Sequence, residues 1–147
     1  MSDTALVIMA RYPQRGSTKT RLAYMIGHDM AVRLYQAFLI DLAQRFAGQS
    51  FDLHWAFTPA KADFHAFVAT LVPSFALHMQ CFPQEGADLN ARLLNAFKWT
   101  YARHFERTIV ISSDSPQLSW ETAMSARAAL DETDVVLGPA DDGGYYL

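Results

Sequence analysis

The chain has 147 residues, of which 51% are hydrophobic, and carries a net charge of −3. This length and composition predict one domain with a packed core and exclude a disordered chain. The slightly acidic balance argues against a general nucleic-acid surface, and no apolar run is long enough to predict a membrane span. The single cysteine, Cys81, excludes an internal disulfide, and we expect a cytoplasmic protein.

Strands and helices alternate along the predicted chain. Apolar or alternating runs predict strands at residues 5–10, 51–57, 75–82, 108–111 and 134–137. Helical spacing predicts helices at 20–26, from 29 to about 48, at 61–71, after an N-cap at Asp88, and from an N-cap at Ser119 to about residue 130. The alternation is typical of an α/β fold, with three layers and a mostly parallel sheet.

The predicted helix after Asp88 has a stripe of larger side chains. Its members recur at helical spacing and are expected to share the buried face: Leu89, Leu93, Phe97, Thr100 and Tyr101.

A cationic loop follows the first predicted strand. Residues 11–21 contain four cations, and Ser17 or Thr18 is the expected N-cap of the next helix, which places Lys19 and Arg21 in its first turn. Cations there oppose the helix dipole, and a bound anion would reverse that penalty. A phosphate site and a solvated basic loop both remain open from charge alone.

Acidic residues follow two later predicted strands. Asp114 precedes Pro116, and Asp141 and Asp142 precede a pair of glycines. Each can be an ordinary turn residue, or a ligand of Mg²⁺ or Mn²⁺, which prefer oxygen atoms. Because ligand sites in parallel sheets lie beyond the carboxyl ends of the strands, the cationic loop and the acids are expected at one edge.

Two common phosphate-binding patterns are absent from the sequence. Thr18 precedes Lys19 where a Walker A loop requires glycine, and a single glycine, Gly16, cannot form the dinucleotide fingerprint. The five histidines show no metal-ligand spacing.

Three segments together resemble a known group. The motifs ARYPQRGSTKTRL, SSDSP and GPADDGGYYL are similar to those of the glycosyltransferase-A-like transferases found alongside radical-SAM and selenium-domain proteins, within the nucleotide-diphospho-sugar transferase superfamily. They also resemble, more distantly, the guanylyltransferase that activates 2-phospholactate and the molybdenum-cofactor nucleotidyltransferases. The resemblance implies a Rossmann-like glycosyltransferase-A fold and a metal-dependent transferase with a nucleotide-linked donor.

The resemblance also implies residue roles. Lys19, Arg21 and Asp114 would be catalytic, and Asp114 would bind the metal with Asp142, because Ser112 stands where many such enzymes carry a first aspartate. The implied nucleotide-binding residues are Arg11, Pro13, Gly16, Ser17, Thr18, Lys19, Arg21, Gln84, Gly86 and Arg92.

Relatives in this group continue well past the final Tyr-Tyr segment. We therefore expect the N-terminal part of a longer domain, whose end is either truncated or replaced by a partner. Such a chain would lack its acceptor site, bind a nucleotide and transfer weakly or not at all. Glycosyl transfer and nucleotidyl transfer are both compatible with the residues, as are a non-catalytic nucleotide-binding module and a purely structural domain. An unpaired sheet edge would favour a homodimer.

Overall fold

The computed structural model describes residues 2–48 and 50–147. Within this part of the chain, strands form one sheet in the order β3-β2-β1-β4, and all neighbouring strands are parallel. The strands are β1 (Thr4–Arg11), β2 (Asp52–Thr58), β3 (Met79–Pro83) and β4 (Arg107–Ser112).

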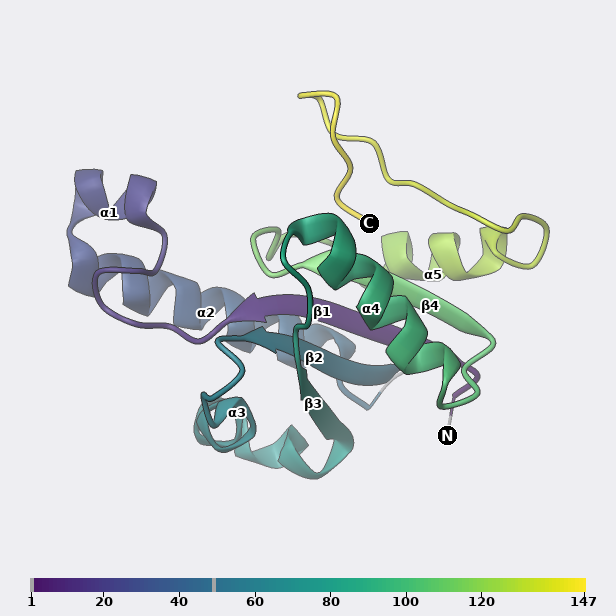
Figure 1. The fold of residues 1–147 in the computed structure, drawn as a ribbon, viewed down its shortest axis with the longest axis horizontal. Coiled ribbons are helices and arrows are strands. Elements are labelled where there is room, and N and C mark those ends of the chain that lie inside the picture. Colours follow the sequence, from purple (N-terminus) through teal and green to yellow (C-terminus); the bar gives the residue numbers. More distant parts are fainter. Residues whose placement is uncertain (1, 49) are drawn as a thin grey trace.

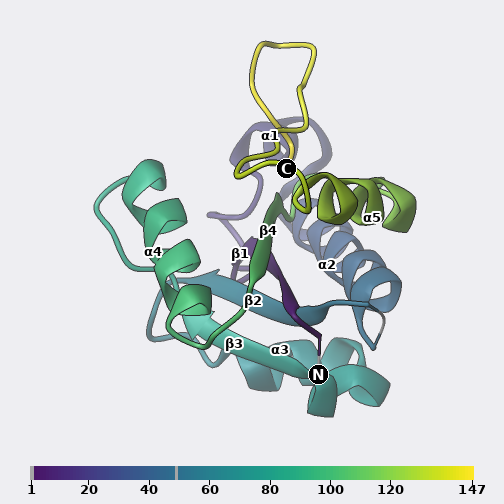
Figure 2. The same ribbon diagram turned by 90° about the vertical axis from the view of Figure 1, so that its right-hand side faces the viewer.

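Helices cover both faces of this sheet (Figures 1 and 2). They are α1 (Thr20–Ile26), α2 (His28–Phe46), α3 (Phe64–Leu71), α4 (Leu89–Tyr101) and α5 (Trp120–Ala129), with a short 3₁₀ helix, η1, at Pro73–His78. α2, α3 and α5 pack on one face and α4 packs on the other, which confirms the predicted three-layer α/β arrangement.

The central strand β1 is buried on both faces. Leu6 and Ile8 belong to the large core under α2, α3 and α5, whereas Val7 packs in a smaller cluster with Ala96 of α4. All three side chains are 0% exposed. A strand covered on both faces must be apolar at consecutive positions, which explains the continuous hydrophobic run.

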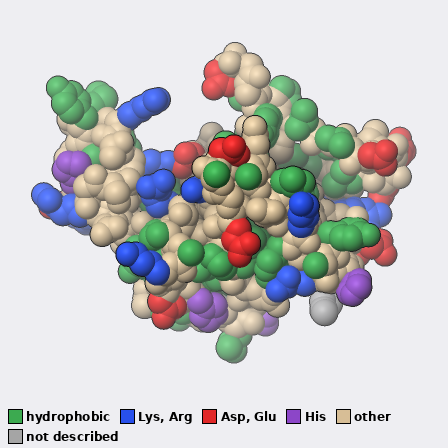
Figure 3. Space-filling model, viewed as in Figure 1, with side chains coloured by type: hydrophobic (Ala, Val, Ile, Leu, Met, Phe, Trp, Pro, Cys, Tyr) green, Lys and Arg blue, Asp and Glu red, His purple; other side chains and the backbone are tan. Residues whose placement is uncertain are grey.

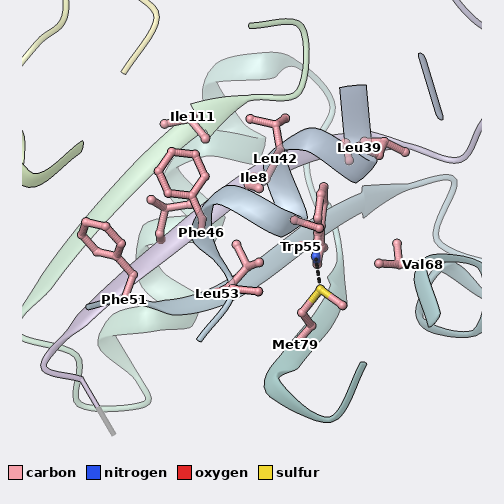
Figure 4. Packing of buried hydrophobic residues seen from close by; sticks show 14 of the residues in the cluster. Ile8, Leu39, Leu42, Phe46, Phe51, Leu53, Trp55, Val68, Met79 and Ile111 are labelled. Atoms are coloured by element: carbon pink, nitrogen blue, oxygen red, sulfur yellow. Dashed lines mark hydrogen bonds between the residues drawn. The ribbon is translucent and has the colours of Figure 1, made fainter. Parts of the chain in front are cut away.

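The larger core is organised around Trp55 of β2 (Figure 4). Its indole Nε1 donates a hydrogen bond to the Sδ atom of Met79 at 3.2 Å, so that the buried ring has a partner on the neighbouring strand. Phe51, Leu53 and Phe57 are buried in the same cluster, as the alternation of their segment predicts.

Two of the five predicted strands are wrong in whole or in part. Residues 73–78 form η1, because Pro73 opens a helical turn, and the strand begins only at Met79. Residues 134–137 form no strand, and Val135 and Leu137 are 73% and 62% exposed. Within the described residues β4 pairs with β1 alone, so the β propensity of this segment finds no ladder partner.

The C-terminal residues instead form a short hairpin (Figure 1). Pro139 and Tyr145 make an isolated antiparallel bridge, and Tyr146 N–H donates to the carbonyl of Gly138 at 2.8 Å. The loop containing Asp141 and Asp142 lies at its turn.

Helix boundaries follow their caps. Asp88 and Ser119 cap α4 and α5 as predicted, and the α1 helix ends at Gly27, whose φ is +87°. α3 begins at Phe64, later than predicted, because Asp63 accepts a hydrogen bond from Ala66 N–H at 3.1 Å. The predicted N-cap of α1 is wrong, since Lys19 occupies that position.

The buried face of α4 also differs from the prediction. Thr100 is buried against the sheet as predicted, together with Ala96, whereas Phe97 and Tyr101 are 44% and 81% exposed. The Thr100 hydroxyl lies 2.7 Å from that of Thr108 on the strand. Small side chains let the helix approach β4 closely, and this docking geometry overrides the stripe of larger residues.

No helix within residues 2–48 and 50–147 is long and apolar enough to cross a membrane.

Candidate functional site

The site lies at the point in the sheet where the order of the strands reverses. The chain runs from β1 to β2 to β3 on one side and then crosses to β4 on the other side of β1. At such a switch point the loops after the two strands, here β1 and β4, diverge and leave a crevice at their carboxyl ends. A cleft of about 790 Å³ opens there, between the loop after β1, the start of α1, the turn after β4 and the start of α4.

The cleft is strongly cationic. Four cations line it, Arg11, Lys19, Arg21 and Arg92, and Asp114 is the one carboxylate among the described residues that does so. Lys and Arg side chains gather on this side of the molecule, beside α1 (Figure 3). Since the whole chain is acidic, this concentration of positive charge predicts an anionic ligand.

Thr18 stabilises the loop after β1 through two hydrogen bonds to Gln14. The Thr18 hydroxyl accepts a hydrogen bond from Gln14 N–H at 2.6 Å, and Thr18 N–H donates to the Gln14 carbonyl at 3.0 Å. Thr18 is 2% exposed, so its side chain shapes the loop rather than capping α1. Gly16 and Ser17 border the cleft, and Gly16 has a φ of +90° that favours glycine.

Lys19 is held at the centre of the site. It is the N-cap residue of α1, with a left-handed φ of 49°. Its Nζ forms an ion pair with Asp114 and lies 5.1 Å from the centroid of the Tyr35 ring. Asp114 N–H in turn donates to the Ser112 hydroxyl at 3.0 Å, which holds the turn after β4. The structure therefore joins two residues that are 95 positions apart in the sequence.

Tyr35 of α2 connects the carboxyl ends of β1 and β4. Its hydroxyl accepts a hydrogen bond from Arg11 N–H at 3.0 Å and lies 2.8 Å from the Ser113 hydroxyl. Burial raises the pKa of the Tyr35 phenol, so this group stays neutral. Because a buried tyrosine hydroxyl requires a polar partner, a tyrosine within the helix predicted from residue 29 is a signal in the sequence that could have indicated this part of the site.

Gln84 ties the far wall of the cleft to the sheet. Its side-chain amide donates to the carbonyls of Ala10 and Ala56 at 3.0 and 2.8 Å, at the ends of β1 and β2. Both amide N–H donors are thereby used, which leaves the carbonyl oxygen as the side-chain group available to a ligand.

Gly86 supports this wall without lining the cleft. Arg92 Nε donates to its carbonyl at 3.1 Å. Its φ is +137°, and a Cβ added there would lie 2.7 Å from the Cβ of Ala91. Glycine is therefore required for the loop to pack against the first turn of α4.

Besides Gly86, two further predicted site residues do not line the cleft. Pro13 is buried beneath the loop. Asp142 lies in the C-terminal hairpin, where its Oδ1 accepts a hydrogen bond from Gly144 N–H at 2.9 Å. Within residues 2–48 and 50–147, no three His, Cys, Asp or Glu side chains come close enough to hold a metal ion together.

The sequence profile of a bacterial family, DUF2064, described as "Uncharacterized protein conserved in bacteria", matches residues 39–147. The chain belongs to this family. The matched residues include part of the site, namely Gln84, Gly86, Arg92 and Asp114. No curated protein matches the DUF2064 chain significantly.

Two solved structures resemble this DUF2064 chain. A "putative nucleotide-diphospho-sugar transferase" from Desulfovibrio desulfuricans G20 is 32% identical, with a TM-score of 0.87 over 99% of this chain and 62% of that one. A cytidylyltransferase from Leptospira borgpetersenii serovar Hardjo-bovis (strain JB197) is 14% identical, with a TM-score of 0.51 over 92% of this chain and 52% of that one. The second likeness concerns the fold alone. The DUF2064 chain thus spans about six tenths of the first protein and about half of the second.

Proposed function

We propose that the cleft binds the phosphates of a nucleotide-linked donor and that the protein is a metal-dependent transferase, with a nucleotide sugar as the favoured donor. The observation that carries this proposal is the cluster of Arg11, Lys19, Arg21 and Arg92 around one cleft at the switch point of a parallel sheet. The likeness to a protein described as a nucleotide-diphospho-sugar transferase supports the same donor class.

A diphosphate or triphosphate fits the chemistry of these side chains. Guanidinium groups bind phosphate oxygens in pairs, and an ammonium group adds a point charge. Lys19 and Arg21 lie at the start of α1, where backbone N–H groups and the helix dipole also favour an anion. As phosphate charge builds up on a leaving group, these cations would stabilise it.

Asp114 is the residue that suits Mg²⁺ or Mn²⁺. Such ions are commonly held by one or two carboxylates together with substrate phosphates and water, so one aspartate at a phosphate cleft matches the required donor chemistry. When bound, the ion would neutralise phosphate charge. Lys19 supplies the positive charge beside Asp114 in the structure.

Calorimetric titration with a panel of nucleotides and nucleotide sugars, with and without Mn²⁺, tests the binding. Arg21→Gln should weaken the affinity for the preferred nucleotide about tenfold, because one charge-assisted contact to phosphate is lost. Arg33→Gln is the matched control, since Arg33 is an exposed arginine on the following helix outside the cleft. Equal affinity of both variants would contradict the assigned site.

The products distinguish the transfer reactions. Release of a nucleoside diphosphate from a nucleotide sugar identifies glycosyl transfer, whereas release of pyrophosphate from a nucleoside triphosphate identifies nucleotidyl transfer. A cytidylyltransferase shares the fold, so the fold is compatible with the second alternative as well. Tight binding without either product would identify a nucleotide-binding module.

A further inference from the structure

The corner between α1 and α2 exposes an apolar surface that the nucleotide cleft does not use. Within eleven consecutive residues the exposed fractions are 94% for Tyr24, 82% for Met25, 40% for Ile26, 51% for Met30 and 36% for Leu34. Exposing so many neighbouring apolar side chains to water is unfavourable, and such patches mark surfaces that bind a partner.

This corner also projects from the molecule. α1 stands at one end, remote from the sheet, and hydrophobic side chains form its outer tip (Figures 1 and 3). Ala23 is buried in α1 and Ala31 is buried in α2, so small side chains hold the two helices together while the larger ones point elsewhere. The apolar tip is therefore a convex feature of the folded chain.

The charge around the tip is positive. Residues 13–34 contain four cations and one carboxylate, Asp29, which is paired with Arg15 at 2.8 Å. Arg21 and Arg33 are exposed beside the apolar residues. A second copy of the chain would bring like charges together, and two convex tips would bury little area against each other. An anionic partner that accepts a convex apolar tip fits both features.

We propose that the α1–α2 corner docks on an anionic lipid bilayer. Tyr24 and Met25 would enter the boundary between headgroups and acyl chains, where amphipathic aromatic and flexible apolar side chains are favourable. Arg15 and Arg33, which lie outside the cleft, would face anionic headgroups, with their aliphatic stems against the apolar layer. Docking of this kind is reversible and weakens with salt.

Vesicle sedimentation tests the docking. The chain should bind vesicles of phosphatidylglycerol and phosphatidylcholine more strongly than phosphatidylcholine alone, and high salt should release it. The double variant Tyr24→Ser/Met25→Ser should reduce the bound fraction roughly fivefold, because it removes the two most exposed apolar anchors. The matched variant Leu77→Ser/Val135→Ser, at residues that are 96% and 73% exposed on other elements, should bind like the parent.

The nucleotide affinity of the double variant distinguishes the docking proposal from the proposed nucleotide site. Tyr24 and Met25 do not line the cleft, so the double variant should keep the nucleotide affinity of the parent. Absence of vesicle binding, or equal binding by both double variants, would overturn the docking proposal whatever the nucleotide titration shows. Self-association in solution that Tyr24→Ser/Met25→Ser abolishes would overturn it in favour of a second copy.

Discussion

At the scale of single residues, Lys19 carries the most information about the site. A non-glycine residue in the left-handed region costs about 1 kcal/mol or more, and such strain tends to persist where a site requires it. Here the unusual backbone places the ammonium group beside both Asp114 and the Tyr35 ring. Lys19 therefore competes for the carboxylate that the proposed divalent cation would use.

Replacing Lys19 should shift this competition. Asparagine tolerates the left-handed conformation, so Lys19→Asn removes the cation while keeping the backbone. Without nucleotide, we expect Mn²⁺ affinity to rise up to about fivefold, as for the loss of a partly exposed ion pair. Nucleotide affinity should fall about tenfold, because one charged phosphate contact is lost. Paramagnetic resonance of free Mn²⁺ measures the first effect and calorimetry the second.

The control for this prediction is Asp114→Asn. It should weaken Mn²⁺ binding both in the parent and in the Lys19→Asn background. Unchanged Mn²⁺ binding in Lys19→Asn, or Mn²⁺ binding that survives Asp114→Asn, would contradict the role of the pair.

At the scale of elements, the loop between β3 and α4 fixes the first turn of α4 at the edge of the cleft. Asp88 caps α4, Gln84 bonds to two strand ends, and Gly86 packs against the first helical turn. The position of Arg92 in the cleft depends on this packing, because Gly86 also accepts its hydrogen bond.

The packing at Gly86 predicts a specific cost. Gly86→Ala places a methyl group 2.8 Å from the Arg92 backbone nitrogen in addition to straining the backbone. Gly27→Ala has a comparable left-handed φ of +87° but no atom within 4 Å, so it isolates the conformational cost. In urea unfolding, Gly86→Ala should lose about 1–3 kcal/mol more stability than Gly27→Ala. Equal losses would show that the loop relaxes without cost.

At the scale of the whole molecule, charged side chains gather at the two ends of the sheet, and one histidine is buried between them. The carboxyl ends carry the cleft, whereas Asp3, Arg107 and Arg127 form a network at the amino ends, with Arg107 bonded to Asp3 at 2.9 Å. Between them His54 is 2% exposed, with neither ring nitrogen hydrogen-bonded within the described residues. Its ring lies 5.1 Å from that of Trp99.

His54 predicts how the free energy of unfolding depends on pH. Burial lowers its pKa from 6.5 to about 4; the negative charge of Asp52 has a smaller opposing effect, and the positive charge of Arg103 lowers the pKa further. Between pH 6.5 and about 4 the unfolded chain binds a proton that the folded chain excludes. The stabilisation is therefore complete above pH 6.5 and is lost on acidification, by up to about 3 kcal/mol.

His54→Leu should flatten this dependence. Urea unfolding of the parent and the variant at several pH values between 4 and 7 measures the difference. His65→Gln, at an exposed histidine, is the control and should leave the slope like that of the parent. A parent and His54→Leu with the same slope would show that His54 is not the responsible group.

Local patterns in the sequence were sufficient for much of the fold. Continuous apolar runs, period-3.6 spacing and capping residues predict the alternation of β1, β2 and β4 with the helices, and the cationic loop after β1. They fail at residues 134–137, where a β-prone segment has no neighbour to pair with, and at α4, where close docking on β4 buries Ala96 instead of Phe97 and Tyr101.

The sequence by itself determined the order of elements and the types of residue that follow β1 and β4, because hydrophobic period, caps and turn residues act over a few positions. Only the tertiary structure decided which of these residues meet. It paired Lys19 with Asp114, brought the Tyr35 hydroxyl between Arg11 and Ser113, and put Asp142 in a separate hairpin. These contacts join residues up to 95 positions apart, and strand order and helix docking set such distances without leaving a local signature.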